Sequence, residues 1–326
     1  EMKTILVYGW FGQGNIGDEL FKDAFARLIT NVNFVFTTRI DVMSLKGIDA
    51  VIFGGGSFVY AKPNITNDAL KLLKSIPVFY VGIGVEGNAI DPIHQSIMSF
   101  AEGVFIRSTQ SFDEVKKINQ RASVVEDIVF SLVSDVKIAK SQQKTILVMP
   151  NIETVPRWNS PHWMHVAWEH FKDEFAQSLD MMIEDFGFSV AFLPSCKNES
   201  MDDTWPACEI ISRMQRRKNC SIYGVPNSKV SDITEIISQH QVVVSQRYHG
   251  IVLSRLAQRP CVAISHHDKL RYAFPSPEQN VSFYEISKSS LVNAVMTAQE
   301  KHHAIYTQDE ASANFSKITE LIKKAI

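Results

Sequence analysis

The sequence lacks several features that would each mark a class of protein. Its four cysteines contain no Cys-x-x-Cys pair, which argues against a zinc ribbon and against a thioredoxin-type redox pair. The apolar runs, such as residues 78–83, are far shorter than the roughly 20 residues that a membrane span needs. Lys and Arg number 33 against 35 Asp and Glu, so no net basic charge favours binding to nucleic acid. An anionic ligand would have to be held by local groups.

The first residues and the cysteines bear on location. Glu-Met-Lys-Thr followed by Ile-Leu-Val lacks the long apolar run of a signal peptide. Cysteines without a pairing pattern fit a reducing compartment. We therefore expect a cytoplasmic protein, for which contact with a membrane surface stays open.

Short β-branched runs alternate with segments of helical periodicity along most of the chain. With 45% apolar residues among 326, the composition suffices for packed cores and suggests two domains at a rough average of about 150 residues each. Strands are predicted at 5–8, 34–36, 50–53, 78–81 and 103–106, and in a second series at 145–148, 189–193, 221–223, 241–244 and 261–264. Such runs are typical of strands that are buried on both faces of a parallel sheet.

Helices are predicted between and after these strands. They lie at 18–30, 67–74, 92–101, 111–119, 164–186, 206–217, 230–239, 250–257, 288–302 and 309–325. Strand–helix–strand repetition predicts an α/β protein with two Rossmann-like, doubly wound parallel-sheet halves. A Lys/Ser/Gln-rich stretch at 137–144 has the composition of a connector. We place an N-terminal domain at 2–140, a C-terminal domain at 141–305 and a closing helix at 306–326.

Two glycine-containing loops follow predicted strands, at the end of a parallel sheet where ligands bind. Residues 12–17 read Gly-Gln-Gly-Asn-Ile-Gly, a formal dinucleotide fingerprint, but Asp18 and Glu19 follow where a pyrophosphate needs positive potential. The loop is either a tight turn with Asp18 capping a helix, or it presents the Asp18 carboxylate to a hydroxylated ligand. The glycine triplet at 54–56, before Ser57, would let a ligand approach the backbone closely.

The sharpest chemical signal is the sequence Ser-Gln-Arg-Tyr-His-Gly at 245–250. It places Arg247, His249 and a helix N-terminus within one short stretch after a strand. A guanidinium, free backbone N–H groups and an imidazole together predict an anion-binding site with a proton donor. The alternative for His249 is a histidine of the core. Lys269 follows another strand end, where it either reaches the same rim or is solvated.

Other polar residues carry weaker signals. Arg107 directly follows the strand at 103–106, where it is either a ligand-binding residue or a surface or ion-pair residue. His162, His165 and His170 are separated by three and five residues, which does not give the i, i+4 pair of a helical zinc site. We expect no metal.

In chain order, these pieces resemble the polysaccharide pyruvyl transferase family. The matching pieces are Gly14-Asn15-Ile16-Gly17-Asp18-Glu19, Gly54-Gly55-Gly56, Gly82-Ile83-Gly84, Arg107 with Ser111, Arg247-Tyr248-His249-Gly250, Pro260 and Lys269. They extend over about residues 4–270, and their order, with the spacing from Arg-x-His-Gly to Lys, is the specific part. The chain departs from the family at Ile128, where Pro often follows the Asp represented by Asp127, and at 82–87, where a Gly-Pro ending is usual.

The resemblance implies a GT-B-like architecture, in which two Rossmann-like domains face each other across a cleft and the last helix often returns to the first domain. It implies transfer of the enolpyruvyl group of phosphoenolpyruvate to two hydroxyls of a sugar, which yields a pyruvate ketal and phosphate. The partners would be phosphoenolpyruvate and a sugar or glycan acceptor, whether free, polymeric or lipid-linked. No other cofactor is implied.

Roles for individual residues follow from the resemblance. His249 would protonate the methylene carbon of phosphoenolpyruvate, and Asp18 would bind or deprotonate an acceptor hydroxyl. The residues expected to bind phosphoenolpyruvate are Arg107, Arg247, Lys269, Tyr248 and Gly250. The residues expected to line the acceptor side are Asn15, Gly55, Gly56 and Ser57.

Two other functions remain open. A nucleotide-sugar-dependent glycosyltransferase of the same fold would hold a pyrophosphate with the same Arg and helix N-terminus. A glycan- or phospho-ligand-binding protein without activity is the other, and the joint presence of Asp18, Arg107, His249 and Lys269 argues against it.

Overall fold

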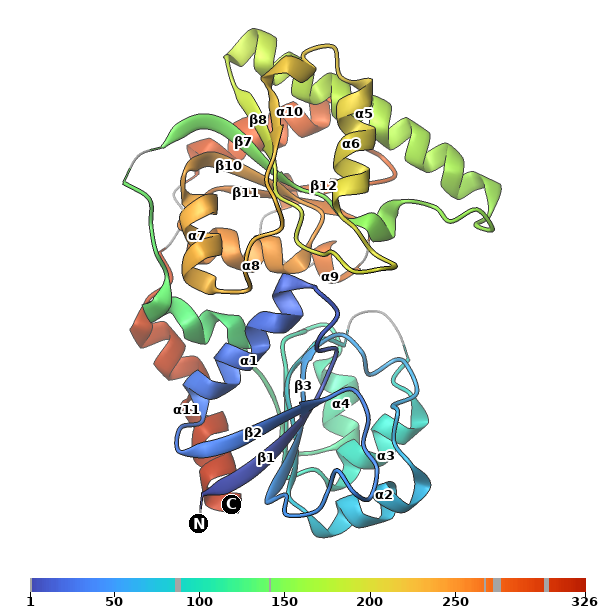
Figure 1. Ribbon diagram of the computed structural model, residues 1–326, viewed down its shortest axis with the longest axis vertical. Helices are drawn as coiled ribbons and strands as arrows, with labels where there is room; N and C mark the ends of the chain where they lie inside the picture. Colours follow the sequence, from blue (N-terminus) through green and yellow to red (C-terminus); the bar gives the residue numbers. More distant parts are fainter. Residues whose placement is uncertain (1, 86–88, 141, 267, 272–276, 302–304) are drawn as a thin grey trace. The chain divides into compact units, whose positions relative to one another are not determined.

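The chain forms two compact units, which Figure 1 shows as a ribbon. The computed structural model describes residues 2–85, 89–140, 142–266, 268–271, 277–301 and 305–326, without the side chains of residues 268 and 269. The first unit consists of Glu1–Gly12, Asp18–Ser134 and Thr307–Ile326, and the second of Gln13–Gly17 and Asp135–Tyr306. Neither unit is therefore one continuous stretch of chain.

The first unit is built on a six-stranded parallel sheet. Its strands are β1 (Lys3–Tyr8), β2 (Val32–Thr37), β3 (Ala50–Gly56), β4 (Val78–Ile83), β5 (Gly103–Ile106) and β6 (Ala122–Val124). They lie in the order β2-β1-β3-β4-β5-β6, and every pair is parallel. The order reverses between β1 and β3, and the loops that follow these two strands are therefore where a ligand of such a sheet binds.

Helices surround this sheet. They are α1 (Ile16–Leu28), α2 (Asn67–Leu72), α3 (Pro92–Phe100), α4 (Phe112–Ile118) and α11 (Gln308–Ala325), with short 3-10 helices at Leu73–Ser75 and Ile128–Asp135. The first residues of α1, Ile16 and Gly17, belong to the second unit. Helix α11 buries Phe315, Ile318 and Ile322, and its Thr319 hydroxyl donates to the carbonyl of Leu28 at 3.0 Å. The last helix of the chain is thus part of the first unit.

Strand β2 differs from the expectation that all strands are buried on both faces. It lies at the edge of the sheet and alternates between half-buried and exposed residues, and Val35 is 44% exposed. An edge strand has a neighbour on one side only, so its side chains receive less cover than those of β3 or β4, which are buried throughout. The apolar run of β2 did not distinguish these positions.

The second unit is also built on a six-stranded parallel sheet. Its strands are β7 (Gln143–Met149), β8 (Ser189–Phe192), β9 (Cys220–Ile222), β10 (His240–Ser245), β11 (Cys261–Ser265) and β12 (Asn280–Ser282). They lie in the order β12-β11-β10-β7-β8-β9, and every pair is parallel. This is the Rossmann order, in which the connection reverses between the first strand, β7, and the fourth, β10.

The helices of the second unit fall into two groups. They are α5 (His162–Phe186), α6 (Thr204–Arg213), α7 (Val230–Ser238), α8 (Tyr248–Leu256), α9 (Asp268–Arg271) and α10 (Lys288–Glu300), with 3-10 helices at Ile152–Thr154, Arg217–Asn219 and Pro277–Gln279. Buried side chains of α5, α6 and α10 form one core with Val148 and Val244 of the sheet. Helices α7 and α8 pack against each other and against β10. The long helix α5 ends at Gly187, whose left-handed φ of 69° closes the helix.

The stretch predicted as a connector is tied to the second unit. The backbone N–H groups of Lys137 and Ala139 donate to the hydroxyls of Thr234 at 3.1 Å and Ser238 at 2.8 Å, both on α7. The stretch is therefore held along α7 through its backbone.

Candidate functional site

The second unit carries four of the predicted site residues, at 247–250, at its topological switch point. Strands β7 and β10 are neighbours, with Met149 opposite Ser245 at their carboxyl ends. Asn151 follows β7, and Gln246 and Arg247 follow β10. Ligands of open parallel sheets bind outside the carboxyl ends of the two strands at which the order reverses. The switch point of this sheet therefore coincides with the anion-binding site that the sequence predicts at 245–250.

Asn151 and Gln246 join the loops of these two strands. Both side chains are buried, at 2% and 1% exposure. The Asn151 N–H donates to the Gln246 side-chain oxygen at 3.2 Å, and the Asn151 side-chain amide lies 3.3 Å from Nε2 of His266, which follows β11. The loops after β7, β10 and β11 are thus held by amide groups that offer no net charge.

Arg247 is held by a carboxylate that the sequence did not single out. Its Nε and Nη2 donate to the two oxygens of Asp203 at 3.1 and 2.5 Å, and its Nη1 lies 3.8 Å from a carboxylate oxygen of Glu153. The side chain of Arg247 is 9% exposed and that of Asp203 is fully buried. Burial alone would lower the pKa of the Arg247 guanidinium, but the charge of Asp203 and the hydrogen bonds to it raise that pKa above its usual value. The guanidinium is therefore a permanent, oriented cation.

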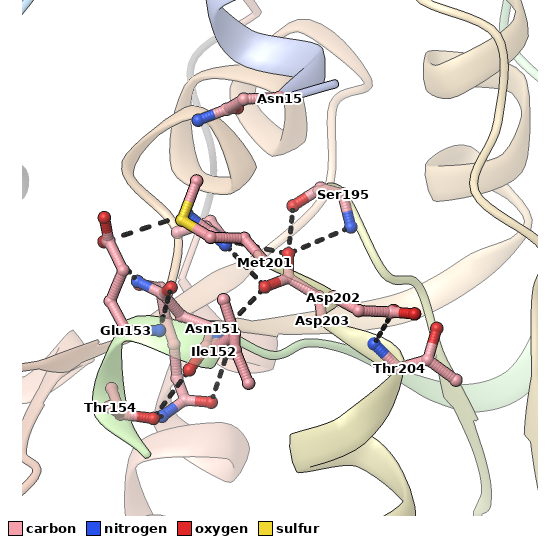
Figure 2. A network of polar contacts seen from close by, with 12 residues as sticks. Asn15, Asn151, Ile152, Glu153, Thr154, Ser195, Met201, Asp202, Asp203 and Thr204 are labelled. Atoms are coloured by element: carbon pink, nitrogen blue, oxygen red, sulfur yellow. Dashed lines mark hydrogen bonds and ion pairs between the residues drawn. The ribbon is translucent and has the colours of Figure 1, made fainter. Parts of the chain in front are cut away.

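Asp203 gathers further donors, as Figure 2 shows. Its carboxylate accepts from the N–H of Ile152 at 2.9 Å, and from the N–H and hydroxyl of Ser195 at 3.2 and 3.3 Å. Ile152 follows β7 and Ser195 follows β8. Asp203 itself directly precedes α6. One carboxylate thus fastens the loops of three neighbouring strands.

His249 stands in the first turn of α8, with its ring against Gly17. A Cβ atom built on Gly17 would lie less than 3.0 Å from three atoms of the His249 ring, which real Cβ atoms essentially never do. The ring of Tyr248 meets that of His249 edge-on, at 5.5 Å between centroids and 85° between planes. His249 is half-buried. Its ring is thus packed into place at the switch point of the second sheet.

The segment Gln13–Gly17 forms part of the second unit through its backbone. The N–H of Ile16 donates to the Ser195 carbonyl at 2.9 Å, and the N–H of Lys197 donates to the Gly14 carbonyl at 3.1 Å. The Asn15 side chain accepts from the N–H of Gly17 at 3.1 Å, which caps the start of α1. The formal dinucleotide fingerprint therefore forms a loop that packs beside the 195–197 segment.

Gly250 and Lys269 are the other residues that were expected on the donor side. Gly250 is buried, its N–H donates to the Arg247 carbonyl at 3.0 Å, and a Cβ there would meet the Ser245 hydroxyl at less than 3.0 Å. The close packing of α8 on β10 thus requires this glycine. The backbone of Lys269 lies in α9, and its side chain lies outside the described part of the structure.

In the first unit, Asp18 lies next to the glycine triplet. A Cβ at Gly56 would lie 3.4 Å from an Asp18 carboxylate oxygen. Gly55 and Gly56 both have a left-handed φ, of 76° and 90°, and a Cβ at Gly55 would overlap the Phe21 ring of α1. Glycine at 55 is therefore required by packing, whereas Gly56 faces the carboxylate.

Arg107 also lies in the first unit and also pairs with a buried aspartate. Its Nη1 donates to Asp127 at 2.6 Å and its Nη2 to the Ser57 hydroxyl at 2.9 Å. The side chains of Arg107 and Asp127 are 4% and 0% exposed. The N–H of Val129 donates to the other oxygen of Asp127 at 3.0 Å. Arg107 is thus in a buried ion pair, and its guanidinium is directed by Asp127 and Ser57.

The sequence did not single out Asn151, Glu153, Ser195 and Asp203 as site residues. Asp202 and Asp203 precede α6 and look like ordinary helix-start residues. Asn151 follows a strand, as site residues do, but its importance depends on β7 lying beside β10, and the chain gives no direct signal for that order.

Neither a metal centre nor a membrane span is evident in the described ranges. There, no group of three or more His, Cys, Asp or Glu side chains is arranged to hold a metal ion. No described helix has the length and apolarity to cross a membrane.

The chain shares its fold with solved structures of proteins in complex with UDP or a UDP-sugar. UDP-GlcNAc 2-epimerase from Methanocaldococcus jannaschii, in complex with UDP-GlcNAc and UDP, is 11% identical, has a TM-score of 0.64, and is matched over 99% of this chain and 100% of its own. S. aureus MnaA with UDP is 10% identical, with a TM-score of 0.61 and coverage of 99% and 96%. Anabaena Alr3699/HepE, in complex with UDP and glucose, is 12% identical, with a TM-score of 0.56 and coverage of 99% of both chains. This likeness shows the fold alone, which is the GT-B fold with two Rossmann-like units.

Sequence comparison identifies the family. No curated protein matches the chain. The family model of polysaccharide pyruvyl transferase matches residues 15–268, which include Arg247, His249 and Gly17, against which His249 packs. The chain belongs to the polysaccharide pyruvyl transferase family.

Proposed function

We propose that this protein transfers the enolpyruvyl group of phosphoenolpyruvate to two hydroxyls of a sugar, forming a pyruvate ketal and releasing phosphate. The observation that carries the proposal is the position of Arg247 and His249 at the switch point of the second sheet, in a chain of a pyruvyl transferase family. An oriented guanidinium and a half-buried imidazole, two residues apart at one helix start, suit a substrate that is anionic and must be protonated.

The chemistry assigned to the second unit begins with a proton. His249 gives it to the methylene carbon of phosphoenolpyruvate, which leaves an oxocarbenium-like carbon that one sugar hydroxyl attacks. The second hydroxyl then displaces phosphate and closes the ketal. One hydroxyl proton returns to His249, and the other leaves with phosphate. Arg247, with the start of α8 and Lys269, holds the anionic groups of the donor.

Residues of the first unit are assigned to the remaining roles. Asp18 binds or deprotonates an acceptor hydroxyl, and Gly56, next to its carboxylate, leaves room for a hydroxylated ligand. Arg107 has its guanidinium directed by Asp127 and Ser57 and contributes to anion binding. The reaction as written needs no further cofactor. The acceptor is a sugar or glycan.

The test is a calorimetric titration with phosphoenolpyruvate, with UDP-sugars titrated in parallel. An alanine at 247 would leave the buried charge of Asp203 unpaired, so the variant is Arg247→Lys, which keeps the charge and loses the two-pronged donor. We expect phosphoenolpyruvate to bind the wild type and to bind Arg247→Lys about tenfold or more weakly. His249→Gln should bind within a few-fold of the wild type and turn over about 100-fold or more slowly with sugar acceptors.

Arg213→Lys is the matched control, because Arg213 forms exposed ion pairs with Glu169 and Asp173 on the same unit. It should change neither binding nor turnover. Binding of UDP-sugars alone would reject the proposal in favour of a nucleotide-sugar-dependent glycosyltransferase. UDP or UDP-sugars are the ligands named for the structures with the same fold.

A further inference from the structure

The Asp203 carboxylate is the most heavily hydrogen-bonded group of the switch point. It accepts from two nitrogens of Arg247, from the N–H groups of Ile152 and Ser195, and from the Ser195 hydroxyl. Two of these donors are backbone groups, which cannot rotate away. Since the carboxylate is also fully buried, its plane is fixed by the loops after β7 and β8. The orientation of the carboxylate therefore sets the orientation of the Arg247 guanidinium that binds to it.

Arg247 uses one edge of its guanidinium for this contact. Asp203 takes the Nε edge with Nη2, and Nη1 on the far edge lies 3.8 Å from Glu153, beyond hydrogen-bond length. Glu153 is 44% exposed in its side chain, in contrast to Asp203. An arginine has five N–H donors in one plane, so fixing one edge also fixes the direction of the other donors.

We infer that Asp203 is a positioning residue that orients Arg247 so that its Nη1 edge binds the anionic group of the donor substrate. The inference rests on the proposed function for the identity of that donor. Asp203 neutralises the charge of Arg247, so the pair attracts an anion through the direction of its N–H groups and not through net charge. The exposed carboxylate of Glu153 stands at the edge that the donor would use, and the donor competes with it.

The two carboxylates beside Arg247 should therefore act in opposite directions. Removal of a negative charge near an anion site strengthens anion binding by simple electrostatics. Glu153→Gln should follow this rule and bind phosphoenolpyruvate as tightly as the wild type, or more tightly. Asp203→Asn also removes a negative charge, but it turns an amide N–H toward the guanidinium and frees Arg247 to rotate. A weaker affinity in Asp203→Asn separates positioning from charge.

The experiment compares Asp203→Asn, Glu153→Gln and the control Asp180→Asn in the full-length protein. Asp180 accepts from the N–H groups of Gln215 and Arg216, both at 2.8 Å, and has no part in the site. Phosphoenolpyruvate and UDP-sugars are titrated into each variant, and urea unfolding is recorded for each. We expect Asp203→Asn to bind phosphoenolpyruvate at least tenfold more weakly, and Asp180→Asn to bind within twofold of the wild type.

A spectroscopic readout follows the arginine without any ligand. In protein labelled with ¹⁵N-arginine, the signals of Arg247 should report slow rotation about its Nε–Cζ bond in the wild type and faster rotation in Asp203→Asn. If Asp203→Asn does not fold, Asp203→Glu takes its place. The longer side chain keeps the charge and displaces the oxygens, so it should weaken binding as well.

The outcomes separate the inference from the proposed function. Unchanged or tighter phosphoenolpyruvate binding in a folded Asp203 variant, or unchanged rotation of Arg247, overturns the positioning role. If the wild type binds only UDP-sugars and Asp203→Asn weakens that binding, the proposed function is wrong and the positioning role stands. If the wild type binds neither ligand, both are rejected.

Discussion

Two single arginines show how charge is arranged in this protein. Arg107 follows β5 in the first unit and Arg247 follows β10 in the second, and each is buried against an aspartate, Asp127 or Asp203. A buried pair of this kind carries no net charge, so each arginine acts through the direction of its N–H groups. The sequence showed the arginines after the strands. It did not show that Asp127 and Asp203 pair with them, because distances of 20 and 44 residues along the chain carry no signal.

The first prediction concerns the pair in the first unit. Arg107→Ala should lower the free energy of unfolding by about 3–5 kcal/mol, because it leaves the Asp127 carboxylate buried without its cation. Arg107→Ala/Asp127→Asn should recover part of that loss. Urea unfolding measures both. Arg121→Ala removes an exposed pair with Glu102 and should cost no more than about 1 kcal/mol. A single Arg107→Ala variant as stable as the wild type would show that the pair contributes nothing to folding.

The first two residues of α1, Ile16 and Gly17, belong to the second unit, whereas the rest of the helix belongs to the first. Residues 13–17 read as a dinucleotide loop, yet they dock by backbone bonds beside 195–197 and support His249. Two of the three glycines of the formal fingerprint are explained by close packing, Gly14 against Lys197 and Gly17 against His249. The pattern predicted the turn correctly. The segments that pack against it, at 195–197 and His249, are distant in sequence and could not be predicted.

Gly17→Ala tests this docking. Alanine favours the helix at this position by about 1 kcal/mol, so helix propensity alone predicts a more stable protein. The added methyl group would instead displace the His249 ring. We expect turnover to fall tenfold or more while phosphoenolpyruvate affinity changes little. Gly224→Ala, where the methyl group meets nothing within 4 Å, should leave turnover intact. Wild-type turnover in Gly17→Ala would mean that His249 needs no support from this segment.

Most of the elements could be predicted from periodicity, and the omissions have physical reasons. The strands with longer apolar runs rich in β-branched residues, such as β1, β4 and β10, are confirmed. Strands β6 and β12 were not predicted, since each has three residues at or near a sheet edge and is half-polar. The 3-10 helix Ile128–Asp135 is too apolar and too irregular in spacing to show helical periodicity. Strand order, which decides where the site lies, depends on contacts distant in sequence.

For the whole molecule, acid should destabilise both units through one buried histidine in each. Burial lowers the pKa of His94 in the first unit to about 4, and burial does the same for His240 in the second. In the unfolded chain these histidines have the ordinary pKa of about 6.5, so they take up a proton there first as the pH falls. Each histidine therefore lowers the free energy of unfolding by up to about 3 kcal/mol as the pH falls from about 6.5 to about 4.

Urea unfolding between pH 7.5 and pH 4.5 measures this effect. His94→Gln and His240→Gln should each flatten the fall in stability with decreasing pH, whatever they do to stability at pH 7.5. The exposed His162 provides the comparison, and His162→Gln should leave the slope as it is. Equal slopes in all four proteins would show that neither buried histidine stays neutral in the folded state.

The interleaved composition of the two units has a consequence for synthesis on the ribosome. Residues 13–17 emerge early, but the segment that they pair with, around 195–197, follows more than 170 residues later. The first unit likewise lacks α11 until Thr307–Ile326 has left the exit tunnel. The apolar surface that Phe315, Ile318 and Ile322 will cover is therefore bare while the rest of the chain is being made, which is the interval in which chaperones bind nascent chains. Neither unit can fold completely until segments far apart in the sequence have both been synthesised.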